Sequence, residues 1–286
     1  HATFYSILFY GMVISMTLTS TNKLKILYHS DMHFNTEDDI EVFVLSLPPE
    51  TNYDIVILAG DITNGNISLI QKLISRINKP VYFVCGNHDY YNRNITEVHK
   101  FLLDAGLNLL KEGVSYTYNH NGVDYTIVGA TLWTTFLLDG RKARHVARKA
   151  AFASVEDFHC ITYNTSKLSL DLMEYLHLKD WNWLAKFKNK SNTIVVTHFP
   201  CSSVTQHERY DGDIMNPYFR SNKVTTGFNI IFSGHTHDCF DIVDKFNCRH
   251  LLNPLGYKRE FYKMISSFDN SIVGVNGYNS HKIVEY

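Results

Sequence analysis

Short apolar runs alternate with amphipathic stretches along the chain. Three of the runs, at 24–30, 54–60 and 80–86, are apolar without a period-two alternation, which is typical of strands buried on both faces. The stretches between them, at 37–47 and 67–78, carry apolar residues at the spacing of an amphipathic helix. The pattern predicts a strand–helix–strand–helix–strand unit, and with it a layered α/β fold.

The alternation continues through the rest of the chain. It predicts further strands at 114–119, 123–129, 193–198, 229–233, 239–244 and 247–252. Helices are predicted near 95–106, 141–153 and 166–188. Because the segment at about 134–190 interrupts the series of strands, we expect it to form a helical cap over a pocket. The expected organisation is one domain over 23–286 that carries this cap insertion.

The first twenty residues differ from the rest of the chain. Residues 1–20 are rich in apolar residues, interrupted by Ser and Thr, and begin with His rather than Met. No Lys or Arg precedes Lys23, so the segment lacks the charged start of a secretory signal. We expect a leader or a fusion remnant outside the folded core, rather than a membrane anchor.

The composition narrows the class of protein. A chain of 286 residues, 45% of them hydrophobic, is long enough for one large core. Its net charge of −1 offers no broad attraction to nucleic acid or to an anionic membrane. No run approaches the roughly 20 apolar residues of a membrane span. The five cysteines are an odd number without a CxxC motif, which favours a reducing compartment and a cytoplasmic location.

Side chains that bind metals or move protons follow the ends of the predicted strands. The segments are Asp31-Met32-His33, Gly60-Asp61, Gly86-Asn87-His88-Asp89, His198 and Gly234-His235-Thr236-His237. The carboxyl ends of neighbouring strands in an open α/β sheet face one crevice. We therefore expect these side chains to share one pocket.

The ligand types suit two metal ions rather than one. Residues two apart in an extended backbone point the same way, so we expect two pairs, Asp31 with His33 and His235 with His237, each to address a common centre. Imidazole and carboxylate together suit zinc, manganese or iron. Asp61 is the candidate for a carboxylate that bridges two ions about 3.5–4 Å apart.

Each motif has a simpler interpretation when taken alone. Glycine followed by Asp or Asn after a strand is ordinary turn chemistry, and a single histidine such as His198 or His237 is more often structural than a ligand. The occurrence of all the motifs in sheet order favours a dinuclear site. Gly60, Gly86 and Gly234 are then expected to let the backbone turn sharply and to leave room beside the ions.

The motifs DMH, GD, GNHD, a lone His after an apolar strand, and GHTH follow one another between residues 31 and 237. In this order they resemble the calcineurin-like metallophosphoesterase superfamily. The resemblance implies a layered β-sandwich core flanked by helices. It also implies one metal ion held by Asp31, His33, Asp61 and His237, and a second held by Asp61, Asn87, His198 and His235.

The same resemblance implies a reaction and roles for the rest of GNHD. A phosphate ester is hydrolysed in line by a hydroxide that bridges two divalent transition metals. These are manganese, iron or zinc, and manganese is expected to serve best in vitro. His88 is expected to protonate the departing oxygen, and Asp89 to orient His88. Because every ligand is present, an enzyme is favoured over a non-catalytic scaffold.

The motifs leave the substrate open. The protein serine/threonine phosphatases of the superfamily carry Asp-Arg-Gly after GD and GNHE in place of GNHD, whereas this chain has Asp61-Ile62-Thr63-Asn64-Gly65. A small nucleotide-like phosphodiester is our preferred substrate, with a DNA or RNA nuclease and a phosphomonoesterase as alternatives. Candidate substrate contacts, mostly aromatic residues that can stack on a base, are Asn64, Trp133, Phe199, His207 and Tyr210.

A basic stretch at 141–149 bears on the nuclease alternative. One face of the predicted helix carries Arg141, Arg144, His145 and Arg148, and its basic residues suit a nucleic-acid backbone. A solvated basic helix face is the simpler interpretation and is favoured. The predicted cap and the flanking aromatic residues favour a small substrate, and the sequence leaves the oligomeric state open.

Overall fold

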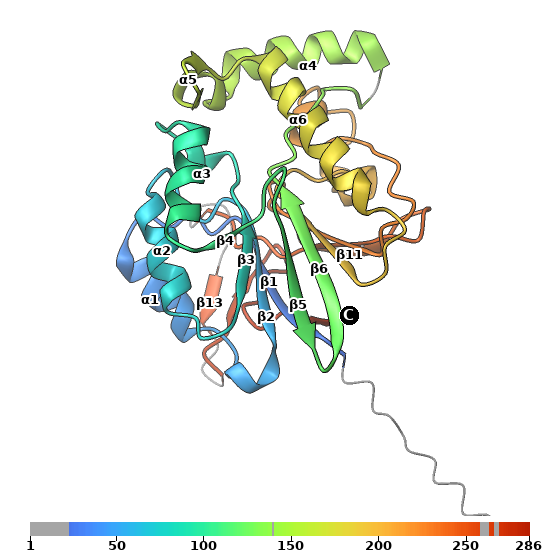
Figure 1. Cartoon of the computed structure of the whole chain (residues 1–286). Helices are drawn as coiled ribbons and strands as arrows, with labels where there is room; N and C mark the ends of the chain where they lie inside the picture. Colours follow the sequence, from blue (N-terminus) through green and yellow to red (C-terminus); the bar gives the residue numbers. More distant parts are fainter. Residues whose placement is uncertain (1–22, 139, 258–262, 266–268) are drawn as a thin grey trace, which may run out of the picture.

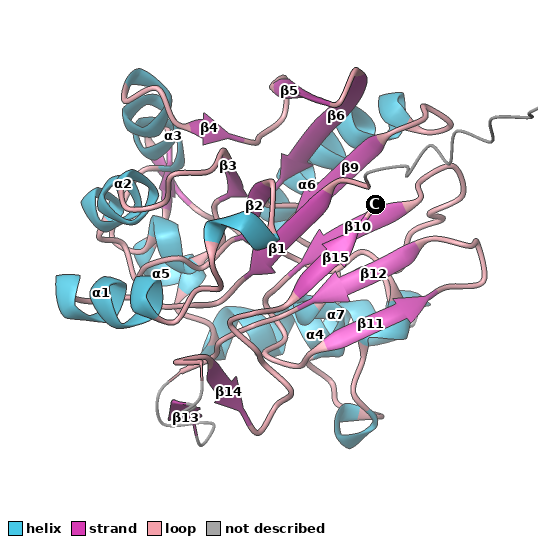
Figure 2. Ribbon diagram, turned by 90° about the horizontal axis from the view of Figure 1, so that it is seen from below, coloured by secondary structure: helices cyan, strands magenta, loops and turns pink. Residues whose placement is uncertain are grey.

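Two large β-sheets form the centre of the molecule, with helices on their outer faces (Figures 1 and 2). The computed structural model describes residues 23–138, 140–257, 263–265 and 269–286. The segment expected to be a leader or fusion remnant, 1–20, lies outside the described residues. None of the described helices combines the length and the hydrophobicity that crossing a membrane requires.

The first sheet has the strand order β15-β1-β2-β3-β4. Strands β1 to β4 run parallel, and β15 pairs antiparallel with β1. Their bounds are Lys25–His29 (β1), Ile55–Ala59 (β2), Val81–Val84 (β3), Asn108–Leu109 (β4) and Ile283–Glu285 (β15). The three strands predicted first along the chain are thus confirmed as neighbours in one parallel sheet.

The second sheet has the order β11-β12-β10-β9-β6-β5. Its four central strands are parallel, and the edge strands β11 and β5 are antiparallel to their neighbours. The bounds are Ser115–His120 (β5), Val123–Ala130 (β6), Thr193–Thr197 (β9), Ile230–Ser233 (β10), Phe240–Val243 (β11) and Arg249–Leu252 (β12). Each of the six corresponds to a predicted strand.

The two sheets pack face to face. Ile26 and Ile57 of the first sheet belong to the same buried cluster as Ile127, Val196 and Phe232 of the second. The alternate residues of these strands point to the helices outside, so the strands are buried on both faces and their sequences are continuously apolar. The predicted fold class, a layered β-sandwich core flanked by helices, is confirmed.

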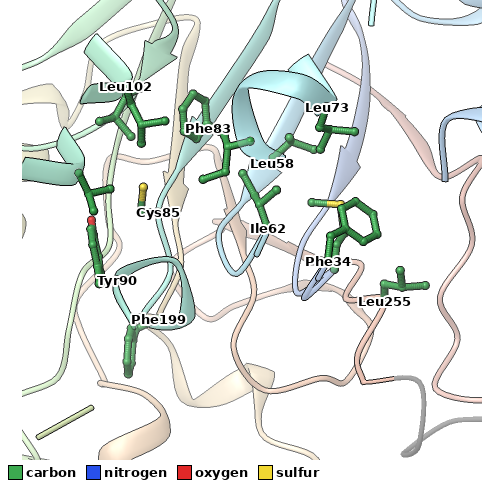
Figure 3. Packing of buried hydrophobic residues seen from close by; sticks show 14 of the residues in the cluster. Phe34, Leu58, Ile62, Leu73, Phe83, Cys85, Tyr90, Leu102, Phe199 and Leu255 are labelled. Atoms are coloured by element: carbon green, nitrogen blue, oxygen red, sulfur yellow. The ribbon is translucent and has the colours of Figure 1, made fainter. Parts of the chain in front are cut away.

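Three helices cover the outer face of the first sheet. Leu58 and Phe83 of the sheet pack with Leu73 and Leu102 of the helices in one buried cluster (Figure 3). The helices are α1 (Glu37–Leu45), α2 (Ile67–Ser75) and α3 (Ile95–Asp104).

Polar caps set where several helices begin. The side chains of Thr36, Asn94 and Ser169 accept hydrogen bonds from backbone N–H groups in the first turns of α1, α3 and α6 (Leu170–Leu184). Each cap satisfies a donor that the helix itself leaves without a partner. These caps agree with the predicted helix starts to within a few residues.

The insertion at about 134–190 divides between two positions. Helices α4 (Gly140–Ser154) and α5 (Asp157–Cys160) lie above the strand ends, toward which the arrowhead of β6 points (Figure 1). Helix α6 instead runs along the second sheet, where Leu184 and Trp181 pack with Val195 and Ile231. Only the part before α6 is therefore positioned as a cap.

The remaining strands and α-helices are short. They are the hairpin β7 (Thr162–Tyr163) and β8 (Ser166–Lys167), helix α7 (Asn216–Phe219), and the pair β13 (Lys263–Ile265) and β14 (Ile272–Gly274).

Candidate metal centre

A cleft of about 830 Å³ opens at the carboxyl ends of the strands. Side chains that the sequence predicted as ligands or as a proton donor form its floor, and the end of α4 with the residues after it forms one wall. The floor contains Asp61, Asn87, His88, His235 and His237, and the wall contains Ser154, Val155 and Glu156.

The ligand side chains leave the strands through tight turns. Five predicted ligands have φ in the left-handed region: Asp31 (53°), His33 (49°), Asp61 (52°), His235 (72°) and His237 (54°). The expectation that Asp31 with His33, and His235 with His237, point the same way because their backbone is extended is therefore wrong. The turns bring the side chains together by reversing the chain, and they also aim the N–H of His235 at the Asp31 carboxylate, 2.8 Å from Oδ1.

Asp31, His33 and His237 form one group of candidate ligands. The Nε2 atoms of His33 and His237 are 3.1 Å apart, and Nε2 of His237 is 3.5 Å from Oδ1 of Asp31. Nδ1 of His33 lies 3.3 Å from Oδ1 of Asn64, whose Nδ2 donates to Asn35. Because that amide oxygen only accepts, the proton of His33 is on Nδ1, and the Nε2 lone pair is available to a metal.

Asp61, His198 and His235 form a second group. Nε2 of His198 is 3.3 Å from Oδ2 of Asp61 and 3.1 Å from Oδ1 of Asn87. Nδ1 of His198 donates to the carbonyl oxygen of Ala59 at 2.8 Å, which sets the tautomer and leaves Nε2 for a metal. Nε2 of His235 is buried and has no hydrogen-bond partner among the described residues.

Asp61 lies between the two groups. One carboxylate oxygen, Oδ2, is 3.9 Å from Nε2 of His33 in the first group and 3.3 Å from Nε2 of His198 in the second. The other, Oδ1, accepts from the N–H of His88 at 2.8 Å. Asp61 is thus close to ligands of both groups, and its role as a bridge between two ions stays a prediction.

Three glycines leave the room that these side chains occupy. A Cβ at any of them would overlap a candidate ligand, so a larger residue would displace that ligand. The distances from such a Cβ would be 2.5 Å to Nδ1 of His198 for Gly60, 2.1 Å to Oδ1 of Asp61 for Gly86, and 2.5 Å to Oδ2 of Asp31 for Gly234.

Burial and mutual contact shift the pKa values of the group. Burial alone would lower the pKa of His198, but the carboxylates of Asp61 and Asp31 raise it to about 9. Burial alone would raise the pKa of Asp61, but His198 and His88 hold it well below its usual range. For His33 burial prevails and lowers the pKa to about 4. The centre therefore keeps ionised carboxylates beside imidazoles, an environment that stabilises cations.

The donor set fits divalent metal ions. The buried Nε2 of His235 has no hydrogen-bond partner within the described chain, and a buried polar atom of this kind is costly unless a partner is supplied. Imidazole nitrogen with carboxylate and amide oxygen is a ligand mixture that suits manganese, iron and zinc. The binding of two ions by these residues stays a prediction.

Both ring nitrogens of His88 have polar neighbours. Nδ1 lies 2.8 Å from Oδ1 of Asn64, and Nε2 faces the hydroxyls of Tyr257 at 2.9 Å and Tyr91 at 3.3 Å. The ring of Tyr91 also stacks on His88, with the centroids 4.2 Å apart. Asn64 was predicted as a substrate contact, but its amide oxygen instead accepts from both His33 and His88, because the turn after β2 points it at their Nδ1 atoms.

Asp89 has a different role from the expected one. Its carboxylate accepts from the backbone N–H groups of Thr63 at 2.8 Å and Gly86 at 2.9 Å, which ties the turn after β3 to the turn after β2. Asn64, rather than Asp89, lies at Nδ1 of His88, so the expectation that Asp89 orients the ring is corrected. Burial and the Asp61 charge raise the pKa of Asp89 to about 7.

Asp157 of α5 is a functional candidate that the sequence did not reveal. Its fully buried carboxylate accepts from Nδ2 of Asn87 at 3.0 Å and from the hydroxyls of Tyr91 at 3.2 Å and Tyr218 at 2.7 Å. By holding the amide nitrogen of Asn87, it turns the amide oxygen toward His198. Asp157 follows no strand and belongs to no motif, so the only signal was its place in the predicted cap.

Two predicted aromatic contacts belong to the core instead. Trp133 is 2% exposed and stacks on Tyr90, and Phe199 is fully buried with its ring 3.8 Å from that of His235. Phe199 lies in the same cluster as the residues of the first sheet (Figure 3). Neither side chain lines the cleft, because both point into the packed layer behind it.

His207 and Tyr210, two predicted substrate contacts, both lie at the edges of cavities. Tyr210 lines the cleft, and both residues line a smaller adjoining cavity. The guanidinium of Arg209 lies over the Tyr210 ring, 4.7 Å from its centroid. His207 and Tyr210 stay candidate substrate contacts.

The basic residues of α4 face another helix. Arg144 and Arg148 pair with Glu174 of α6, and Arg148 pairs also with Asp171 of the same helix at 2.6 Å. The side chain of Arg141 lies outside the described side chains. Two of the three predicted phosphate contacts are thus neutralised within the fold, which weakens the nucleic-acid interpretation of 141–149.

Comparison with known proteins adds independent information. The model of the family described as calcineurin-like phosphoesterase matches residues 24–239. A transmembrane protein with a metallophosphoesterase domain from Danio rerio is 29% identical over 98 residues, and the match spans 32% of this chain but only 22% of that protein. An uncharacterized protein of Acanthamoeba polyphaga mimivirus is 25% identical over 271 residues, which cover 82% of this chain and 91% of that protein.

The fold is also similar to that of a solved structure. Phosphopantetheinyl hydrolase from Mycobacterium tuberculosis matches with a TM-score of 0.66, at 18% sequence identity over 83% of this chain and 91% of that chain. At this level of identity the likeness concerns the fold alone.

Proposed function

We propose a substrate for this chain from the premise that it belongs to the calcineurin-like phosphoesterase family and is a metal-dependent hydrolase of phosphate esters. The proposed substrate is a small, nucleotide-like phosphodiester. We propose two divalent transition metals as cofactors, with manganese as the first to test. The observation that carries the dinuclear part is that Asp61 belongs to one ligand group, with His198 and His235, and also lies near His33 of the other. A cytoplasmic location is proposed as well, and the free thiols of the five cysteines support it.

The proposed ligands divide between the two ions. When bound, the ions supply Lewis acidity and lower the pKa of an attacking water. Asn64 and Ala59 act behind the ligands, because they hold the Nδ1 protons of His33 and His198 and so direct Nε2 into the cleft. The first ion would be held by Asp31, His33, Asp61 and His237, and the second by Asp61, Asn87, His198 and His235.

His88 is proposed as the proton donor for the leaving group. The amide oxygen of Asn64 holds its Nδ1–H, so Nε2 faces the cleft. A doubly protonated His88 delivers the Nε2 proton to the departing ester oxygen. The hydroxyl of Tyr257, 2.9 Å from Nε2, occupies the place in which we expect that oxygen.

The dimensions of the cleft support a small substrate. Its volume of about 830 Å³ falls within the range of small-molecule sites, roughly 300–1,000 Å³. Tyrosine rings line it and offer faces on which a base can stack. The residues 154–156 bound it on one side, which limits access for a folded phosphoprotein or a long duplex. The lining tyrosines with exposed or half-buried rings are Tyr91, Tyr210 and Tyr257, whereas Tyr218 is 3% exposed and packs on Phe199 and Phe219.

One experiment tests metal and substrate together. Protein stripped by a chelator is titrated with Mn²⁺, Fe²⁺ or Zn²⁺, and bound metal is measured beside hydrolysis of bis(4-nitrophenyl) phosphate and 4-nitrophenyl phosphate. We expect activity to rise with the second equivalent of metal and to be higher on the diester. Full activity with one ion would contradict the dinuclear proposal, and a preference for the monoester would contradict the substrate proposal.

A further inference from the structure

A second cavity adjoins the metal cleft. Its volume is about 100 Å³, and it lies between the segment 205–220 and the turn after β10. Tyr210, Phe219 and Thr236 line both the cavity and the cleft, so the two spaces are continuous. Because Thr236 stands between His235 and His237 in sequence, the cavity begins beside the candidate metal centre.

Three buried oxygen atoms among the residues that line this cavity have no hydrogen-bond partner in the described chain. They are Oε1 of Gln206, Oγ1 of Thr236 and Oδ2 of Asp238. The amide of Gln206 is oriented by its nitrogen, which donates to Asp211, so its oxygen is the atom without a partner. Two of the three atoms can only accept a hydrogen bond, and the Thr236 hydroxyl can accept one as well.

Asp238 is the strongest of the three acceptors. Its residue is 3% exposed, and its other carboxylate oxygen, Oδ1, accepts from Nη2 of Arg209 at 2.6 Å. A buried carboxylate oxygen without a donor is costly, because it has lost its hydration and gained nothing in return. A ligand that brings N–H groups into the cavity would remove that cost, and so would ordered water.

The acceptor atoms and the shape of the lining favour an organic amine. Asp213, Asp238 and Arg220 line the cavity, and Arg209 pairs with Asp238, so the selectivity is expected from the three acceptor atoms rather than from net charge. The rings of Phe219 and Tyr210 form an apolar wall, which suits an alkyl amine better than a hydrated metal ion.

We propose that this cavity is a substrate subsite that binds a primary amine carried by the ester group of the phosphate, with Gln206, Thr236 and Asp238 as its acceptors. The inference rests on the proposed phosphodiesterase function, and adds a specificity to it. A short arm between phosphorus and the amine is expected, because the cavity begins beside the metal centre. The substrate class is therefore an aminoalkyl phosphodiester.

Two matched chromogenic probes test the proposal. The first is 4-nitrophenyl 2-aminoethyl phosphate, and the second is 4-nitrophenyl propyl phosphate, in which a methyl group replaces the ammonium group. The leaving group is the same in both, so the ratio of their kcat/KM values reports the amine contact alone. With the metal-loaded protein we expect a ratio of roughly tenfold or more in favour of the amine, the size of a hydrogen bond to a charged group.

Variants locate the effect. Gln206→Met and Asp238→Asn should each reduce the ratio severalfold toward unity, and circular dichroism with metal analysis checks that each variant is folded and loaded. Asp241→Asn is the matched control. Asp241 lies on the edge strand β11, and its carboxylate, like that of Asp238, pairs with an arginine, here Arg249 of β12. The control should leave the ratio unchanged.

The outcomes separate this inference from the proposed function. Hydrolysis of both probes at equal kcat/KM would overturn the subsite and leave the phosphodiesterase intact, with water as the occupant of the cavity. Hydrolysis of neither probe, with both metals bound, would overturn the phosphodiesterase proposal itself. An amine preference that persists in both variants would also overturn the assignment to Gln206 and Asp238.

Discussion

Charged and metal-binding side chains gather in two regions of this molecule, the strand-end turns and helix α4, and the two regions use them in opposite ways. In the turns, carboxylates and imidazoles converge on one buried point, and oxygen atoms such as those of Asn64 and Ala59 hold the imidazole protons away from it. On α4, Arg144 and Arg148 face Glu174, and their charge is neutralised within the fold.

The difference shows what makes a cluster of charges functional. Residues that point at a common centre while their outer atoms are held by neighbours leave lone pairs available for a ligand. Residues that pair with an opposite charge on the next helix, here in half-buried pairs, contribute mainly to packing, and exposed pairs of this kind are worth about 0–1 kcal/mol each. Variants in the two regions should therefore differ by orders of magnitude in their effect on catalysis.

Asp61→Asn should have the largest effect. A neutral amide bridges two cations poorly, so we expect a loss of roughly 10³-fold in kcat/KM and weaker binding at both metal positions. Elemental analysis and turnover of the diester are the measurements. Asp241→Asn is the control on the exposed edge strand. Two retained metals with activity within tenfold of the unchanged protein would contradict the bridging role.

The pair His88→Ala and Asn87→Ala separates two roles within one turn. His88→Ala should keep its metal content and lose about 10²–10⁴-fold in turnover of an ester with a poor leaving group, but less with 4-nitrophenol, which needs no proton. Asn87→Ala should lose metal from one position. Equal loss of metal in both variants would remove the distinction between ligand and proton donor.

Asp157→Asn tests whether the cap sets the geometry of the centre. The carboxylate accepts hydrogen bonds from Asn87, Tyr91 and Tyr218 with two oxygen atoms, and an amide has only one. Asn87 is then held less well, so we expect the affinity for one metal to fall about 10–100-fold. Titration with Mn²⁺ followed by electron paramagnetic resonance reports it independently of activity. Asp171→Asn, an exposed carboxylate on α6, is the control. Unchanged binding of the second metal would limit Asp157 to a structural role.

The double variant Arg144→Gln and Arg148→Gln should have the smallest effect on catalysis. Hydrolysis of a small diester should stay within about twofold, while the free energy of unfolding falls by about 1 kcal/mol from the lost pairs. Glu174→Gln should lower stability similarly. If DNA cleavage were the function, the double variant would instead bind DNA less tightly. The dependence of that binding on salt would become flatter by roughly one unit of slope per lost phosphate contact.

Local pattern was sufficient to predict the elements that place the centre. The apolar runs before Asp31, Asp61 and Asn87 are long enough and uninterrupted enough to be buried strands, and parallel neighbours bring their ends together. The strands and α-helices missed were short: β4, β7 and β8 have two residues each, β13, β14 and β15 have three, and α5 and α7 have four. Segments of that length carry too few positions for a period to be detected.

The hydrogen-bond partners behind the ligands could not be predicted in the same way. Asn64 and Asp89 are both polar residues close to strand ends, and nothing in their positions along the chain shows which of them contacts the His88 ring. Asp157 approaches from 70 residues away in the chain, through an insertion that follows no motif. Trp133 lies close in sequence to a strand end, but its side chain turns into the core.

The left-handed turns have a consequence for how the protein tolerates mutation. Asp31, Asp61 and His237 hold left-handed backbone conformations that glycine adopts most easily, and a residue with a Cβ there costs of the order of 1 kcal/mol, least for Asp. At these positions the candidate ligand side chains are thus kept at a cost in folding stability. At His237 the usual ranking should reverse: an inactive glycine variant should melt at a higher temperature than the alanine variant, although glycine ordinarily destabilises a folded chain. A lineage released from selection for catalysis would be expected to drift toward glycine there, and to become more stable as it loses its activity.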